Sequence, residues 1–119
     1  MRLKDICEII SAEVLTPTLD LNVEVSSVCG CDLMSDVLAY TKANTLLLTG
    51  LASLQVIRTA EMADLIGIVF VRGKRPEPEV IELAIQNKLP LLTTHYPLYE
   101  TAGLLFQVGL PGCYQLEEV

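Results

Sequence analysis

The clearest candidate for ligand chemistry in this sequence is a short basic cluster, Arg72-Gly73-Lys74-Arg75, which holds three of the eight basic residues. An arginine can grip two phosphate oxygens at once, and a glycine N–H lets a ligand approach the backbone closely. This combination suits a nucleotide or another phosphorylated metabolite. The alternative is a solvated surface loop whose cations offset Glu77 and Glu79.

The basic cluster follows an apolar run, and comparable polar segments follow two other apolar runs. Open parallel sheets bind ligands at the carboxyl ends of their strands, and helix N-termini near Ser53 and Pro78 would add positive partial charge there. We therefore expect an anion site at this edge, with the Gly50 and Gly73 N–H groups facing the ligand. The predicted ligand-binding residues are Thr49, Gly50, Ser53, Arg72, Gly73, Lys74, Arg75, Thr93, Thr94 and His95.

The four cysteines, Cys7, Cys29, Cys31 and Cys113, are the other reactive side chains. Cys29 and Cys31 would point to one face of a strand and could supply two metal ligands. Zinc sites usually have a two-residue gap and a second ligand pair, whereas the other cysteines here are distant in sequence and His95 is the only histidine. We expect free thiols with a packing role, no metal and no cofactor.

Two carboxylates, Asp32 and Asp36, stand with Ser35 where a strand would pass into a helix. They could bind a metal or act as acid and base, or they could cap the helix and complement its dipole. No third ligand or glycine loop accompanies them, so capping is favoured, as it is for Thr93-Thr94 before a helix that begins at Pro97. The chain has neither a Walker (P-loop) sequence nor a dinucleotide-binding fingerprint. We predict no catalytic residues, and a small redox or hydrolytic enzyme would depend on Cys29, Cys31 and His95 alone.

Short apolar runs alternate with helical repeats along the chain. Strands are predicted near 13–15, 23–31, 45–49, 66–71 and 90–93, and helices near 3–10, 32–40, 53–63, 78–88 and 97–109. Such alternation indicates βαβ units. The predicted fold class is α/β, a compact and mostly parallel sheet of four to five strands with helices on both faces.

Residues 71–84 and 89–94, together with residues 31–37, resemble the DRTGG domain family, over roughly 3–110. The same pattern occurs in the N-terminal domain of HPr kinase/phosphorylase and in a regulatory segment of some phosphotransacetylases. The string that names the family is absent, and Thr49-Gly50-Leu51 and Val71-Arg72-Gly73 stand where related sequences often carry Thr-Gly-Gly. The resemblance implies a regulatory or dimerising accessory domain, sometimes linked to adenine nucleotide control, with no known catalytic residues to carry over.

Length, charge and the pattern of apolar residues limit the number of domains, the class of partner and the location. A chain of 119 residues fits one domain, predicted as 1–110 with an acidic tail at 111–119. A net charge of −7 disfavours nucleic acid. No run of about 18 apolar residues suggests a membrane span, and no signal-peptide core follows Met1, so a cytoplasmic location is expected.

The hydrophobic fraction of 51% is more than one small sheet and its helices would hide, which predicts a self-complementary patch and a homodimer. We therefore expect a non-catalytic, ligand-sensing regulatory domain. The alternative is a protein-interaction or dimerisation module that docks on a partner enzyme and binds no small ligand.

Overall fold

A five-stranded sheet forms the middle layer of the protein, whose computed structural model describes residues 1–113. Its strands are β1 (Glu13–Val14), β2 (Ser27–Gly30), β3 (Thr45–Thr49), β4 (Gly67–Phe70) and β5 (Leu91–Thr93), in the order β1-β5-β4-β3-β2. Strands β2 to β5 are parallel, and β1 pairs antiparallel to β5. The predicted mostly parallel sheet is confirmed.

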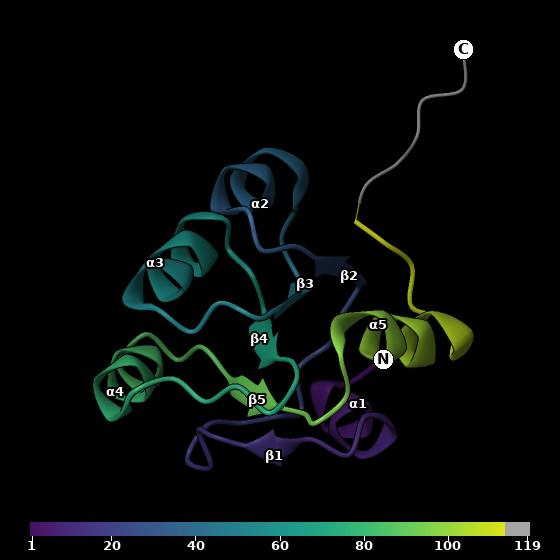
Figure 1. Ribbon diagram of the computed structural model, residues 1–119, viewed down its shortest axis with the longest axis horizontal. Coiled ribbons are helices and arrows are strands. Elements are labelled where there is room, and N and C mark those ends of the chain that lie inside the picture. Colours follow the sequence, from purple (N-terminus) through teal and green to yellow (C-terminus); the bar gives the residue numbers. More distant parts are fainter. Residues whose placement is uncertain (114–119) are drawn as a thin grey trace.

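Five helices cover the two faces of this sheet: α1 (Leu3–Ile9), α2 (Met34–Tyr40), α3 (Leu54–Met62), α4 (Pro78–Gln86) and α5 (Leu98–Gln107). Helices α2, α3 and α4 each connect neighbouring parallel strands. Such connections are nearly always right-handed, and repeating them in one direction across a sheet puts the helices on one face. Figure 1 shows α2, α3 and α4 on that face and α1 and α5 on the other. None of the helices within residues 1–113 is long and apolar enough to cross a membrane.

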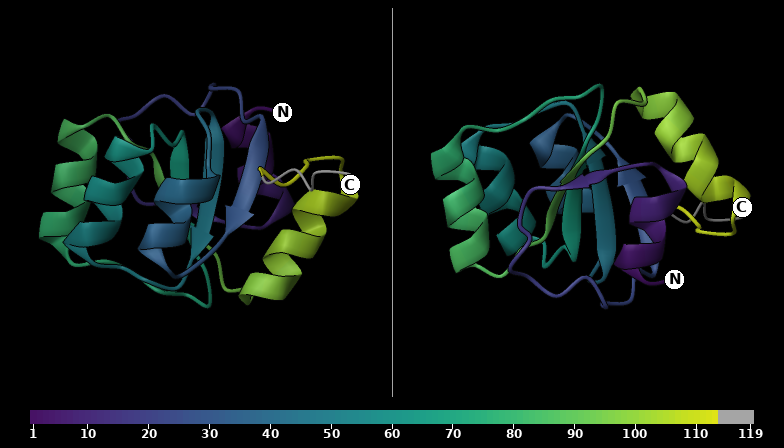
Figure 2. Two further views of the ribbon diagram at one scale, coloured as in Figure 1. Left: turned by 90° about the horizontal axis from the view of Figure 1, so that it is seen from above. Right: turned by 90° about the horizontal axis from the view of Figure 1, so that it is seen from below.

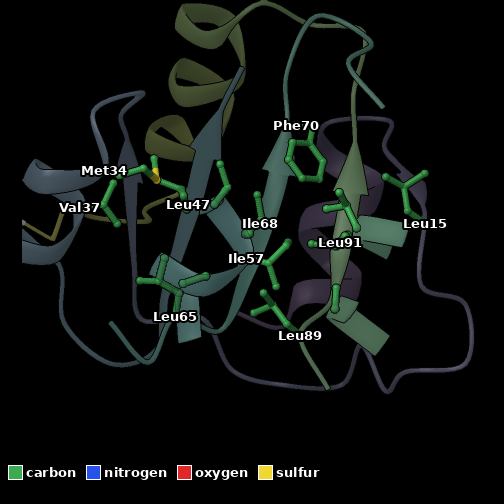
Figure 3. Packing of buried hydrophobic residues seen from close by; sticks show 14 residues of the cluster. Leu15, Met34, Val37, Leu47, Ile57, Leu65, Ile68, Phe70, Leu89 and Leu91 are labelled. Carbon is green, nitrogen blue, oxygen red and sulfur yellow. The ribbon is translucent and has the colours of Figure 1, made fainter. Parts of the chain in front are cut away.

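Alternation along the central strands divides the core in two. On β3, Leu47 belongs to the cluster beneath α2–α4, whereas Leu46 and Leu48 pack with α1 and α5. Figure 3 shows the first cluster, in which Ile57 from α3 meets Ile68 on β4. Strands buried on both faces read as continuous apolar runs, which is why the sequence predicted them well.

One predicted strand, 23–31, is too long, because only Ser27–Gly30 joins the sheet. Residues 23–25 pair instead with the start of the chain. The Leu3 N–H donates to the Val23 carbonyl over 2.9 Å, and the Val25 N–H donates to the Met1 carbonyl over 2.8 Å. The backbone groups of this segment are thus satisfied outside the ladder.

The predicted side-chain caps are wrong. None of the five N-cap residues in the described chain makes a side-chain capping bond, including Ser53 before α3. Thr93 and Thr94 do not cap α5, because their hydroxyls donate over 2.7 Å to the Lys74 and Ile10 carbonyls. Both threonines are buried, so they pair with loop carbonyls that pack against them.

Four of the helices end in a common C-terminal capping motif. Helices α1, α3, α4 and α5 are each followed by a residue in the left-handed conformation, namely Ser11, Asp64, Lys88 and Gly109. In each case the next N–H donates back to a carbonyl in the last turn, as from Leu89 to Ala84. Three of these four positions lack glycine, although a side chain there carries a steric cost.

Lys88→Gly should therefore stabilise the fold. Lys88 is exposed at φ 56°, and removing its Cβ relieves strain that outweighs the added freedom of the unfolded chain. We expect a gain of roughly 0.5–1 kcal/mol in the free energy of unfolding, measured by urea denaturation. Lys42→Gly is the control, because Lys42 is an exposed loop lysine without positive φ and its replacement should not stabilise. Equal or lower stability of Lys88→Gly would contradict this account.

Candidate functional site

The loops after β3, β4 and β5 meet at one edge of the sheet, as expected for parallel strands. The register places Thr49 opposite Phe70 and Phe70 opposite Thr93, so the three strands end level with one another. The start of β1 lies at the same edge, because Glu13 pairs with Thr93. This edge carries two separate hollows.

The first, which we call the Arg72 hollow, has a volume of about 500 Å³. It is lined by Asp32, Gly50, Leu51, Val71, Arg72, Lys74, Pro97 and Leu98. The second, the Arg75 hollow, has a volume of about 270 Å³. It is lined by Ser11, Ala12, Glu13, Gly73, Arg75, Thr93, Thr94 and His95. The predicted binding residues are thus divided between two places, and two of them line neither hollow: Ser53 is exposed and Thr49 is buried.

A left-handed turn after β4 separates the basic side chains. Arg72 and Gly73 have φ values of 59° and 70°. Their N–H groups donate to the Tyr96 and Thr94 carbonyls over 2.9 and 2.8 Å, which ties this loop to the one after β5. Arg72 and Lys74 consequently line one hollow, whereas Gly73 and Arg75 line the other.

Gly73 is required for this turn rather than for approach to a ligand. Its N–H is already bonded to Thr94, so the expectation that it faces a ligand is wrong. A Cβ at this position would lie 3.2 Å from Nδ1 of His95 in addition to the cost of positive φ.

Asp32 is the residue of the site that sequence reasoning missed. Its Oδ1 accepts a hydrogen bond from the Thr49 hydroxyl over 2.8 Å and another from the Gly50 N–H over 2.9 Å. The predicted capping role is wrong for Asp32, because Leu33 is the N-cap of α2, and the Gly50 N–H is likewise not free for a ligand. Asp32 comes just after β2 and Thr49 is the last residue of the adjacent β3, but only the strand order reveals that they are neighbours.

The Arg72 hollow therefore combines two cations with one carboxylate. Within residues 1–113 neither Arg72 nor Lys74 forms a salt bridge, and both side chains are exposed. Leu51, Pro97 and Leu98 add apolar walls. This set of groups suits an anion attached to an apolar ring.

In the Arg75 hollow, the cation is already paired with a carboxylate of the same chain. Arg75 lies 2.7 Å from Glu13, and its hydrogen bond and charge lower the pKa of the Glu13 carboxyl while Glu13 raises the pKa of Arg75. Both side chains are exposed, so the pair contributes little to stability. Arg75 is nevertheless paired with a carboxylate, whereas Arg72 and Lys74 have no salt-bridge partner in the part of the chain that the structure describes.

Among the described residues, no group of three histidine, cysteine or acidic side chains is placed to hold a metal ion. His95 is exposed beside Gly73, and Asp36 lies in the first turn of α2.

The fold and its edge define a small α/β domain of a known class. A model of the DRTGG domain matches residues 5–108, so the chain belongs to the DRTGG domain family. Among solved structures, it is similar to the CBS and DRTGG domains of the regulatory region of Clostridium perfringens pyrophosphatase, complexed with the activator diadenosine tetraphosphate. The TM-score is 0.69 at 16% identity, over 98% of this chain and 51% of that chain. The likeness shows a shared fold, and the present chain spans about half the length of that one. No curated protein matches the chain.

Asp32→Ala should destabilise the domain by about 1–2 kcal/mol, because it leaves the buried Thr49 hydroxyl and the Gly50 N–H without their shared acceptor. Asp32→Asn keeps an acceptor oxygen and should lose less. In urea denaturation, the effects of Asp32→Ala and Thr49→Val on the free energy of unfolding should not add, since both variants lose the same Thr49–Asp32 hydrogen bond. Full additivity, or unchanged stability of Asp32→Ala, would show that the bond contributes nothing.

Proposed function

We propose that this DRTGG domain is a non-catalytic, ligand-sensing regulatory module that binds a nucleotide or another phosphorylated metabolite in the Arg72 hollow. The observation that carries the proposal is the presence of two cations, Arg72 and Lys74, without salt-bridge partners within residues 1–113, in one hollow of about 500 Å³. Small-molecule sites commonly have volumes in this range.

The remaining walls suit the other parts of a nucleotide. Arg72 can hold two phosphate oxygens in a forked contact, and Lys74 adds a point charge. The apolar surfaces of Leu51 and Leu98 can pack against a ring. Both bonds to Asp32 end on Oδ1, so a ligand hydroxyl could donate to Oδ2.

The similar regulatory region of the pyrophosphatase binds diadenosine tetraphosphate, which makes adenine nucleotides the first ligands to test. A regulatory role also fits the position of the hollow at the start of α5. Pro97 and Leu98 line it, and the Arg72 N–H donates to the carbonyl of Tyr96 just before them. A ligand there would contact the start of the helix that carries Tyr99 and Phe106, the two most exposed aromatic side chains within residues 1–113.

Adenosine diphosphate and triphosphate should raise the melting temperature of the wild-type domain. Arg72→Ala should weaken binding more than tenfold, corresponding to roughly 1.5–3 kcal/mol, because it removes a charge-assisted contact, and Lys74→Ala should weaken it less. Isothermal titration calorimetry provides the affinities.

Arg58→Ala is the matched control, because Arg58 is exposed on α3 and lines neither hollow. Arg75→Ala tests the second hollow, and an effect confined to that variant would move the site there. If neither these nucleotides nor inorganic phosphate binds the wild type, the interaction module becomes the better function.

A specific observation favours that second function, with a second copy of the chain as partner. Tyr99, Gly103 and Phe106 form an exposed stripe on α5 at helical spacing, and the two rings are 85% and 74% exposed. Nothing lies within 4 Å of the Cβ position at Gly103. An aromatic ring of one copy could therefore pack over Gly103 of the other, as a two-fold interface requires.

The wild-type chain should therefore sediment as a dimer at micromolar concentration. Phe106→Glu should dissociate it, because the symmetric contact would bury two like charges. Met62→Glu is the control, since Met62 is 73% exposed on α3, which lies on the other face of the sheet. A monomeric wild type, or equal dissociation by both variants, would exclude this interface.

A further inference from the structure

Two cysteines that are far apart in sequence lie side by side at the open edge of the sheet. Residues 111–113 run parallel to β2, with Val28 opposite Gly112. The Val28 N–H donates to the Pro111 carbonyl over 2.9 Å, and the Cys113 N–H donates to the Val28 carbonyl over 3.2 Å. Figure 2 shows this yellow segment beside the blue strand β2. These residues, assigned to the tail by the sequence analysis, thus extend the sheet, whereas residues 114–119 lie outside the described chain.

The register brings the two thiols together. One position beyond the Val28–Gly112 pair, Cys29 faces Cys113, and the side chains of a parallel pair point to the same face of the sheet. Neighbouring strands lie about 4.8 Å apart, within the Cα separations of about 4.4–6.8 Å that disulfides span. The pKa of Cys29 is raised to about 12, first by burial and then by the charge of Cys113 and a side-chain hydrogen bond with it. The backbone register and the raised pKa of Cys29 thus both place Cys113 beside the Cys29 thiol.

The other two thiols are differently placed. The Cys31 thiol donates to the Leu33 carbonyl and the Cys7 thiol to the Ala12 carbonyl, each over 3.3 Å. Cys7 is on α1, across the sheet from the face to which Cys29 belongs. Cys29 and Cys113 are accordingly the pair with geometry for a bond.

We propose that Cys29 and Cys113 are a redox modification site that forms a reversible disulfide by exchange with a low-molecular-weight disulfide. The Cys113 thiolate attacks one sulfur of the small disulfide, whose S–S bond breaks and releases one small thiol. Cys29 then loses its proton to solvent and attacks the Cys113 sulfur, which expels the second small thiol. Two protein thiols are oxidised, and one small disulfide is reduced to two thiols.

Cys113 reacts first because Cys29 has little thiolate at neutral pH. Once Cys113 is joined to the small thiol, the Cys113 sulfur can no longer be charged, so this contribution to the raised pKa of Cys29 is lost. The product fastens residues 111–113 along β2, where an unpaired strand edge would otherwise be a template for another chain. Gly112 also lines the groove between β2 and α5 that Tyr99 and Phe106 border, so oxidation would hold one wall of that groove in place.

The test is to incubate the full chain with oxidised glutathione, count free thiols, and map disulfides by mass spectrometry of non-reduced peptides. We expect two of the four thiols to be lost, a peptide linking Cys29 to Cys113, a higher melting temperature, and reversal by dithiothreitol. Cys7→Ser and Cys31→Ser are matched controls and should still form the bond.

Two further variants test the order of the steps. Cys29→Ala should accumulate glutathione on Cys113, because the resolving thiol is gone, whereas Cys113→Ala should leave Cys29 unmodified. The melting temperature of each reduced variant verifies that it folds. A bond between Cys31 and Cys113, a bond between chains, glutathione that stays on wild-type Cys113, or four remaining thiols would each overturn the proposal.

Discussion

The structure depends on one constraint, which is that a parallel ladder buried on both faces must pair its backbone groups and be covered on both sides. All five residues of β3 are buried, as are those of β4 and β5. Each strand can only be satisfied by neighbouring strands, and the connections between parallel neighbours must cross a face of the sheet. This places α2, α3 and α4 on one face, and α1 and α5 cover the other.

The same constraint produces the site. Because the parallel strands end level, four connecting segments converge where the ladder stops, and their polar groups need partners of another kind. Asp32 provides them for Thr49 and Gly50, and the Tyr96 and Thr94 carbonyls provide them for the turn at Arg72-Gly73. Within residues 1–113, these internal bonds leave Arg72 and Lys74 without salt-bridge partners at the edge, and this is why the hollow suits an anion.

The outer edge of the sheet at β2 and the outward face of α5 are less completely paired and covered than the central strands. Residues 111–113 are held to β2 by two backbone hydrogen bonds, beside an apolar groove bordered by Tyr99 and Phe106. The Arg72 hollow, the aromatic stripe on α5 and the Cys29–Cys113 pair all adjoin α5 or β2. A regulatory domain of the proposed kind needs such a surface, since a signal must reach a partner through groups that the core does not already bind.

The sequence by itself determined the class of fold and most of its elements. Apolar runs such as 45–49 indicate strands that are buried on both faces, and the helical repeats after Ser53 and Pro78 identify one inward face each. These features are local, because period and burial are encoded in consecutive residues. The resemblance that rests on residues 71–84 likewise named the family correctly. The convergence of the strand ends at one edge also followed from the parallel pattern.

Only the tertiary structure decided which polar residues meet. The bond from Thr49 to Asp32 requires β2 beside β3, and the meeting of Cys29 with Cys113 requires residues 111–113 to add to the edge of the sheet. The division of the basic cluster requires positive φ at Arg72, a non-glycine residue for which no local preference predicts it. Strand neighbours, register and the sign of φ are set by packing of the whole chain, because each depends on contacts between segments that the sequence does not place side by side.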